Sequence, residues 1–286
     1  MINDNVYVPY AQIADRLPIC KGDVLYVISD LLDIAKVCRD NGERFECERF
    51  IEYLQEAVGE EGTLLFPTFN WDFCKGIAFD YHKTKGKTGA LGNAALKTSG
   101  FKRTQHPLYS FAVWGKLQST LSGLDNKSAF GENSPFEYMH KYNAKALIIG
   151  LAASIKNTYI HYVEQMIGVD FRYEKDFSAL YADEGGAIEK RTYSMYVRDL
   201  DINLQATSFA EIDNIMSTLG ISKDFIINNV SFHVVDLSGM FEIVSLELRY
   251  NHANNLYTFT DKKAKEEYVC VHKPIIGRKF TAKEGR

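Results

Sequence analysis

A continuous apolar run followed at once by a helix-forming segment most constrains the fold of this 286-residue chain. Residues 145–153 read KALIIGLAA, and residues 157–165 read NTYIHYVEQ. A short, uninterrupted apolar run is typical of a strand that is buried on both faces, as in a sheet covered by helices. The pair therefore predicts a buried strand in an α/β sheet, with a helix leaving it.

The N-terminal part shows the same alternation of strand and helix. Residues 22–29, GDVLYVIS, predict a short strand, and the next residues include Asp30, which with Ser29 supplies capping residue types for a helix. Residues 49–58 carry apolar side chains at helical spacing, and residues 63–69, TLLFPTF, predict a second buried strand. Strand, helix and strand in this order indicate a crossover unit with parallel strands.

The middle of the chain begins with a long excursion. Residues 70–105 are rich in Lys, Thr and Gly and lack periodicity, as functional or mobile loops often do. Residues 108–115 are strand-like. Ser134 followed by Pro135 predicts a helix start, with the serine as cap and the proline in the first turn.

The C-terminal part has a different character. An extended segment at residues 191–204 precedes an amphipathic helix at residues 209–220. We expect an α/β fold with a central, largely parallel or mixed sheet flanked by helices, and a smaller C-terminal α+β lobe. The expected division is a main region at 1–171 and a lobe at 172–286, although no linker marks the boundary and one domain remains an alternative.

Composition argues against several classes of function. The net charge of −4 gives no overall basic signal for nucleic acid, and no apolar stretch approaches the roughly 20 residues of a membrane span. The N-terminus lacks the basic end and apolar segment of a secretory signal. The five cysteines are scattered without a CxxC pair, so we expect reduced thiols and no metal. These features predict a cytoplasmic protein.

The clearest chemical signal lies in the helix after the buried strand. His161 and Glu164 are three residues apart and share one helix face. With Asn157 or Thr158 as cap, His161 lies near the first turn, where the helix dipole disfavours an imidazolium. A neutral imidazole can act as a general base, and the carboxylate can orient it. A plain packing pair is the alternative, and no third ligand indicates zinc.

Further polar residues follow predicted strands. Thr68 and Asp72 come at the end of the second strand, and the block RTQHPLYS contains His106 and Ser110. Backbone N–H groups at residues 29–31 could hold a phosphate at a helix start. Neither a GxGxxG nor a GxxxxGK[ST] motif is present, so a dinucleotide or triphosphate site is not indicated.

Taken together, these segments resemble the antibiotic N-acetyltransferase family, of the aminoglycoside 3-N-acetyltransferase type. The resemblance spans roughly residues 20–177 and follows the family's order of blocks. These blocks are GDVLYVISDL, GTLLFPTFNW, Phe79–Asp80 followed by KTGALGN, RTQHPLYSFAVWG, FGENSPFEYM, and ALIIGLAASIKNTYIHYVEQ ending near VDFRYEK.

The resemblance implies transfer of an acyl group from acetyl-CoA or another acyl-CoA to an amine, without a metal. It assigns His161 and Glu164 as catalytic residues. The residues it implies for coenzyme A binding are Ser29, Asp30, Leu31, Thr68, Ser110 and Thr158. Those it implies for substrate binding are His106 and Arg172, and Asp72 and Asp80 are further candidates as carboxylates that could face the crevice.

The acceptor is open at this stage. Arg172 and Arg198 suit the phosphates of a nucleotide-linked amino sugar, which we take as the first interpretation. An aminoglycoside acceptor, with antibiotic resistance, is the alternative, and a non-catalytic ligand-binding relative is a second alternative. Acyl chain length stays undetermined, and a homodimer is left open.

Overall fold

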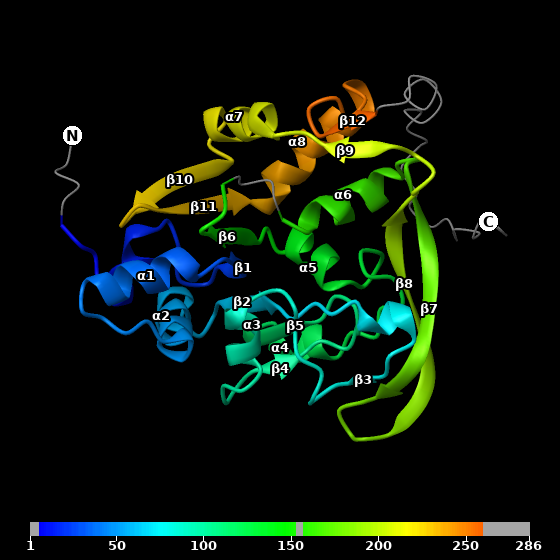
Figure 1. The fold of residues 1–286 in the computed structure, drawn as a ribbon, viewed down its shortest axis with the longest axis horizontal. Helices are drawn as coiled ribbons and strands as arrows, with labels where there is room; N and C mark the ends of the chain where they lie inside the picture. Colours follow the sequence, from blue (N-terminus) through cyan, green and yellow to red (C-terminus); the bar gives the residue numbers. More distant parts are fainter. Residues whose placement is uncertain (1–5, 153–156, 260–286) are drawn as a thin grey trace.

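A central mixed sheet organises the computed structural model, which describes residues 6–152 and 157–259 (Figure 1). In spatial order its seven strands are β10 (Ser222–Ile227), β11 (Val230–Asp236), β6 (Lys145–Ile149), β1 (Val24–Ser29), β2 (Thr63–Pro67), β5 (Phe111–Gly115) and β4 (Lys102–Arg103). The three strands at its centre are parallel: β1 pairs with both β6 and β2. The outer strands β5 and β11 are antiparallel to their neighbours, so the sheet is mixed, within the expected fold class.

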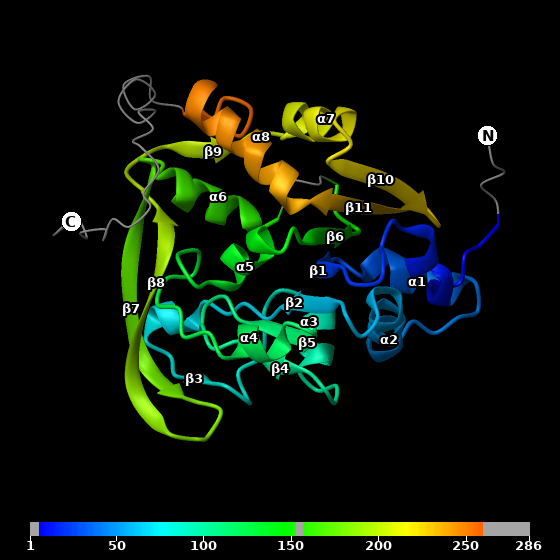
Figure 2. The same ribbon diagram turned by 180° about the vertical axis from the view of Figure 1, so that it is seen from behind.

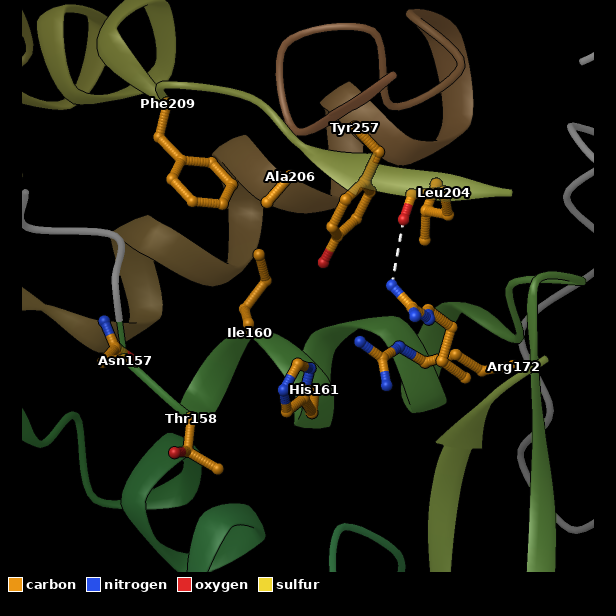
Figure 3. A pocket seen from close by; sticks show the side chains of 10 residues that line it. Asn157, Thr158, Ile160, His161, Arg172, Leu204, Ala206, Phe209 and Tyr257 are labelled. Carbon is orange, nitrogen blue, oxygen red and sulfur yellow. Dashed lines mark hydrogen bonds between the residues drawn. The ribbon is translucent and has the colours of Figure 1, made fainter. Parts of the chain in front are cut away.

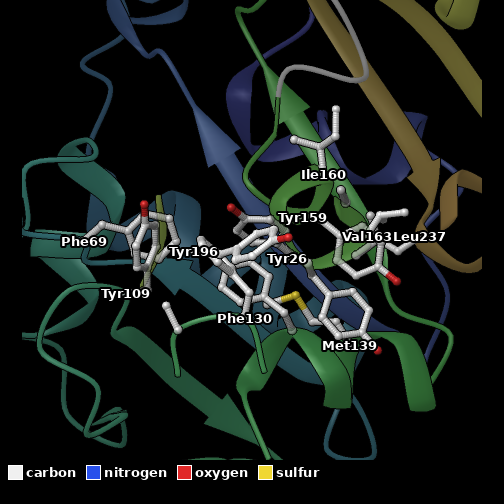
Figure 4. Packing of buried hydrophobic residues seen from close by; sticks show 14 of the residues in the cluster. Tyr26, Phe69, Tyr109, Phe130, Met139, Tyr159, Ile160, Val163, Tyr196 and Leu237 are labelled. Atoms are coloured by element: carbon white, nitrogen blue, oxygen red, sulfur yellow. The ribbon is translucent and has the colours of Figure 1, made fainter. Parts of the chain in front are cut away.

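Two helical layers cover the sheet, because alternate residues of its central strands point to opposite faces. Tyr26 and Ile148 pack into one core, and Leu25 and Leu147 pack into the other. The first core includes the helices α5 (Pro135–Lys141), α6 (Tyr159–Ile167) and α8 (Leu237–Tyr250), and the second includes α1 (Leu32–Asp40), α2 (Cys47–Val58) and α3 (Ala90–Ala95). Figure 4 shows part of the first core, where Tyr26, Phe130 and Tyr159 meet.

The buried strand expected at residues 145–153 is confirmed, but β6 ends earlier, at Ile149. Gly150 has a φ of 70°, and a Cβ there would lie 2.3 Å from the carbonyl oxygen of Asp30. This close approach requires glycine and turns the chain out of the sheet. The loop after β6 therefore meets the loop after β1 at the carboxyl edge of the parallel strands.

The helix starts largely follow the sequence-based expectations. Ser134 Oγ accepts a hydrogen bond from the Glu137 N–H at 3.2 Å, with Pro135 in the first turn of α5. Of the two capping residues expected before α1, only Asp30 acts locally, since its Oδ1 accepts from Leu32 N at 3.1 Å. Ser29 is still the last residue of β1.

A long hairpin closes one end of the molecule (Figures 1 and 2). Its strands β7 (Arg172–Ala182) and β8 (Ile188–Arg198) pair along their whole length, and the short β3 (Phe79–Asp80) joins β7. The short strand β9 (Leu204–Ala206) then pairs with β12 (Tyr257–Phe259). Arg172, at the start of β7, is thereby placed opposite Arg198, at the end of β8.

The segment after β9 returns to the main sheet. The helix α7 (Ala210–Thr218) leads into the hairpin of β10 and β11, and β11 pairs with β6. Residues on both sides of position 171 thus build one sheet, and the division at 171/172 stays a prediction. The remaining short elements are the 3-10 helices η1 (Tyr10–Gln12), η2 (Ala14–Arg16) and η3 (Asp72–Lys75) and the helix α4 (Gln118–Ser122).

Within the described ranges, no helix combines the length and the apolar character that crossing a bilayer requires.

Candidate active site

The helix α6 presents His161 at its first turn. Thr158 is the N-cap residue, and the His161 N–H donates to the Thr158 carbonyl at 3.1 Å. Tyr159 and Val163 anchor the helix, because both are fully buried in the core. The His161 side chain is 29% exposed, and its ring packs edge-on against Phe130 at 5.6 Å between centroids. The imidazole is therefore held by packing while one side stays accessible.

Glu164 lies directly behind His161 and is fully buried. Its Oε2 atom lies 2.8 Å from His161 Nδ1 and 2.7 Å from Arg172 Nε. Its Oε1 atom accepts a hydrogen bond from the phenol of Tyr257. A buried carboxylate needs such partners, since an unpaired charge in the interior is costly. The expected pairing of His161 with Glu164 is thus present in the structure.

The surroundings fix the protonation of this pair. Burial acts to raise the pKa of Glu164, but Arg172, His161 and Tyr257 outweigh it and lower that pKa overall. Burial and the charge of Arg172 lower the pKa of His161, although Glu164 opposes them. At neutral pH the carboxylate is ionised and the imidazole is neutral. Because the carboxylate can only accept, Nδ1 carries the ring proton and Nε2 is left to accept another.

A pocket of about 390 Å³ opens beside His161 (Figure 3). The helix α6 forms its floor, and the strands β9 and β12 form the opposite wall. Its polar groups include two arginines, and one of these, Arg198, donates to the Leu204 carbonyl at 2.9 Å. The lining residues are Asn157, Thr158, Ile160, His161, Arg172, Arg198, Leu204, Ala206, Phe209 and Tyr257.

Thr158 and Arg172 share this pocket with His161, as their assignment to the site requires. Thr158 also hydrogen-bonds the buried phenol of Tyr26. Thr158 is the N-cap of α6 and His161 and Glu164 lie on that helix, whereas Arg172 comes from β7.

Thr68 and Ser110 do not line the pocket. Both are fully buried, and their hydroxyl oxygens lie 2.8 Å apart. Arg103 donates from Nε to Ser110 Oγ at 3.0 Å, and it reaches the carbonyls of Thr68 and Thr84 with its terminal nitrogens. The Thr68 N–H donates to the Ser110 carbonyl. These groups hold the loop of residues 81–88 against β2, and their contact with coenzyme A stays a prediction.

Ser29, Asp30 and Leu31 lie at the carboxyl end of β1, outside the lining of this pocket. Asp30 is exposed, and a Cβ on Gly89 would lie 3.4 Å from the Ser29 carbonyl. The end of β1 and the loop before α3 therefore lie side by side. Contact of these residues with coenzyme A is likewise a prediction.

The two aspartates expected to bind substrate are paired with lysines. Asp72 lies 2.6 Å from Lys87 Nζ, and Asp80 lies 3.4 Å from Lys83 Nζ. Asp80 Oδ1 also accepts from the N–H groups of His82 and Lys83 at 2.9 Å each. Asp72 lines a separate cavity of about 130 Å³. Neither carboxylate lines the pocket beside His161.

His106 is buried and lies outside that pocket. Its Nε2 is 3.3 Å from the carbonyls of Lys127 and Ser194, and its Nδ1 accepts from the Tyr109 N–H. These contacts are those of a core histidine that ties loops together, and its contact with substrate stays a prediction.

Tyr257 and Phe209 belong to the pocket but carried no signal in the sequence. Tyr257 is 93 residues from its partner Glu164, so no local spacing could reveal the contact. Arg172 was singled out by the family resemblance, whereas its place opposite Arg198 follows from the pairing of β7 with β8. Within the described residues, no three His, Cys, Asp or Glu side chains gather as a metal site would require.

The lining is compatible with the reactive end of an acyl thioester. Ile160, Leu204, Ala206 and Phe209 offer apolar surface, and His161 and Thr158 offer polar groups beside it. A pocket with an apolar wall and a few convergent polar groups is the usual setting for a small-molecule reaction.

Comparison with known proteins gives a consistent result. A family model described as aminoglycoside 3-N-acetyltransferase matches residues 27–248. The crystal structure of aminoglycoside acetyltransferase AAC(3)-Xa is similar, with a TM-score of 0.69, 18% identity, and coverage of 83% of this chain and 91% of that chain. The binary complex of AAC-IIIb with CoASH has a TM-score of 0.70 at 18% identity, covering 85% and 95%. Sisomicin-bound AAC-VIa has a TM-score of 0.69 at 17% identity, covering 85% and 98%.

Proposed function

Because the chain belongs to the aminoglycoside 3-N-acetyltransferase family, a family of coenzyme A-dependent N-acetyltransferases, we propose that it acetylates an amino group of an aminoglycoside in the pocket beside His161. The single observation that carries this proposal is the His161–Glu164 pair. An ionised, fully buried carboxylate holds Nδ1 of a neutral imidazole at 2.8 Å, and the ring lines an open pocket.

In this mechanism Nε2 of His161 accepts a proton from the amine as its nitrogen attacks the thioester carbonyl. Acetyl-CoA supplies an already activated carbonyl, so no acyl-enzyme is required. The new C–N bond replaces the C–S bond, and the proton held on Nε2 can pass to the departing thiolate. Glu164 stabilises the transient imidazolium through Nδ1. Such general base catalysis contributes on the order of 10²–10⁴-fold.

Arg172 tunes the base. Its guanidinium keeps Glu164 ionised, and it also disfavours a proton on His161. The imidazole therefore stays ready to accept a proton at neutral pH. Thr158 lines the same pocket, and its hydroxyl is our candidate for a donor to the oxyanion.

A second acceptor class is favoured by the charges of the pocket. Arg172 and Arg198 line it, and no carboxylate is among its described lining residues. Asp199 follows Arg198, but its Oδ1 accepts the N–H of Asp201 at 3.0 Å within the same turn. An aminoglycoside is a polycation and suits an acidic site, whereas a phosphorylated or nucleotide-linked amino sugar suits arginines. An anionic amino sugar is therefore the second candidate.

The proposal is tested by thiol release from acetyl-CoA with sisomicin, glucosamine and a nucleoside-diphosphate-linked amino sugar as separate acceptors. Turnover with sisomicin supports the first candidate, and turnover restricted to the nucleotide-linked sugar supports the second. His161→Ala should lose on the order of 10²–10⁴-fold in kcat. Its affinity for coenzyme A, measured by calorimetry, should stay close to that of the wild type.

Binding of coenzyme A without thiol release from any amine would favour the non-catalytic alternative. Equal kcat values for the wild type and His161→Ala would mean that His161 is not the general base.

A further inference from the structure

Tyr257 reaches the catalytic pair from the far end of the chain. Its phenol donates to Glu164 Oε1, although the two residues are 93 positions apart. Tyr257 is 8% exposed and Glu164 is fully buried, so the contact lies away from bulk water. The tyrosine also falls outside residues 27–248, the segment that the family model matches.

The phenol is held in place by a rigid local frame. Tyr257 pairs with Ala206 across β12 and β9, and its N–H donates to the Ala253 carbonyl at 2.8 Å. Its ring packs edge-on against Phe171 at 5.4 Å. Phe171 directly precedes Arg172, so the same contact joins Tyr257 to the start of β7. Figure 3 shows Tyr257 extending from its strand towards the helix α6.

The two oxygens of Glu164 are engaged differently. Oε2 meets both His161 and Arg172, at 2.8 and 2.7 Å. For Oε1, Tyr257 is the hydrogen-bond donor that the described part of the chain supplies. Without this donor Oε1 would be a buried acceptor with no partner, which favours rotation of the carboxylate away from its present orientation.

We propose that Tyr257 is a positioning residue for the acetyl transfer, which fixes the Glu164 carboxylate so that Oε2 holds Nδ1 of His161. This inference rests on the proposed function. Tyr257 acts through Glu164, so it controls which imidazole nitrogen keeps its proton and which one faces the pocket. The C-terminal strand β12 is then part of the machinery that orients the base.

The test compares Tyr257→Phe with Tyr181→Phe as a matched control. Tyr181 is also fully buried, and its phenol donates to the Gln105 carbonyl at 2.7 Å, away from Glu164. Tyr257→Phe should lower kcat roughly tenfold, the size expected for one hydrogen bond to a charged group. KM for acetyl-CoA and for the amine should change little, and Tyr181→Phe should keep the wild-type kcat. A rise in KM with kcat unchanged would instead make Tyr257 a substrate contact and overturn the proposal.

A double substitution separates this role from a general structural one. In a Glu164→Ala background, Tyr257→Phe should cost almost nothing further in kcat, because the oxygen that accepts from the Tyr257 phenol is gone with the rest of the carboxylate. If the fold loss in kcat of the double variant equals the product of the two single-variant losses, Tyr257 does not act through Glu164.

A readout that needs no turnover keeps the inference distinct from the proposed function. NMR of the His161 ring should show a higher pKa in Tyr257→Phe, since a carboxylate that loses a donor attracts the imidazolium more strongly. An unchanged ring pKa and tautomer would overturn the inference, whether or not an acceptor has been found. A wild type that transfers no acetyl group to any amine would overturn only the proposed function.

Discussion

The guanidinium of Arg172 lies 2.7 Å from Oε2 of Glu164, the same oxygen that His161 contacts. One carboxylate oxygen of Glu164 thus contacts both the permanently charged Arg172 and the titratable ring of His161. Arg172 stabilises the ionised Glu164 and opposes a charge on His161. Glu164 therefore holds the imidazole in place, while Arg172 keeps it neutral and able to accept a proton.

Removal of Arg172 should disturb both partners. In Arg172→Met the buried carboxylate loses its permanent counter-charge, and breaking a buried pair in this way costs roughly 3–5 kcal/mol. We expect lower stability in urea unfolding and a higher pKa for both Glu164 and His161. Arg172→Lys keeps the charge and should recover part of the loss. If Arg172→Met is as stable as the wild type, the ion pair contributes nothing and the assignment fails.

His161 should titrate below the ordinary range of histidine. Burial and Arg172 lower its pKa from 6.5, and Glu164 only partly offsets them. The ring should therefore remain neutral at pH values where a free histidine is half protonated, and NMR of labelled histidine measures this directly. Arg172→Met should raise the midpoint. A wild-type midpoint above 6.5 would mean that Glu164 outweighs burial and Arg172.

The resemblance drawn from the sequence blocks is confirmed by the family match to residues 27–248. Several elements before α6 were predictable from periodicity and capping residues, as Ser134 and Pro135 show at the start of α5. Residues 70–105 were expected to form a long excursion without periodicity, but they contain β3, α3 and β4. The pairing of His161 with Glu164 could also be predicted from the sequence, since their spacing of three residues places them on one helix face.

The other site residues depend on contacts that no local pattern encodes. Tyr257 joins Glu164 only through the pairing of β12 with β9. Thr68 follows β2 and Ser110 precedes its antiparallel neighbour β5, so the two lie at the same edge of the sheet. For Thr68 the sequence alone suggested a place in the crevice. The buried Arg103 instead draws the Ser110 hydroxyl and the Thr68 carbonyl inward. Which way a polar side chain faces was thus decided by a distant partner.

Arg198 should select among acceptors by charge. In Arg198→Gln we expect KM for a nucleoside-diphosphate-linked amino sugar to rise about tenfold, as for the loss of one charge-assisted contact. KM for sisomicin should stay the same or fall, because a positive charge leaves the pocket lining. Arg191→Gln is the control, since Arg191 lies on β8 but pairs with Asp183 and Glu189. Equal effects on both acceptors would argue against an anion contact at Arg198.

His106 should make the fold sensitive to acid. Burial lowers its pKa from 6.5 to about 4, and its ring is neutral with Nε2 donating to carbonyls and Nδ1 accepting from the Tyr109 N–H. Between these two pKa values the unfolded chain binds a proton that the folded chain does not, so stability falls as the pH falls. The full contribution is about 3 kcal/mol, lost progressively between the two values.

Urea unfolding across this range should show a steeper pH dependence for the wild type than for His106→Phe, which keeps an aromatic ring against Tyr193 but cannot titrate. Parallel stability curves for the two proteins would place the acid sensitivity elsewhere.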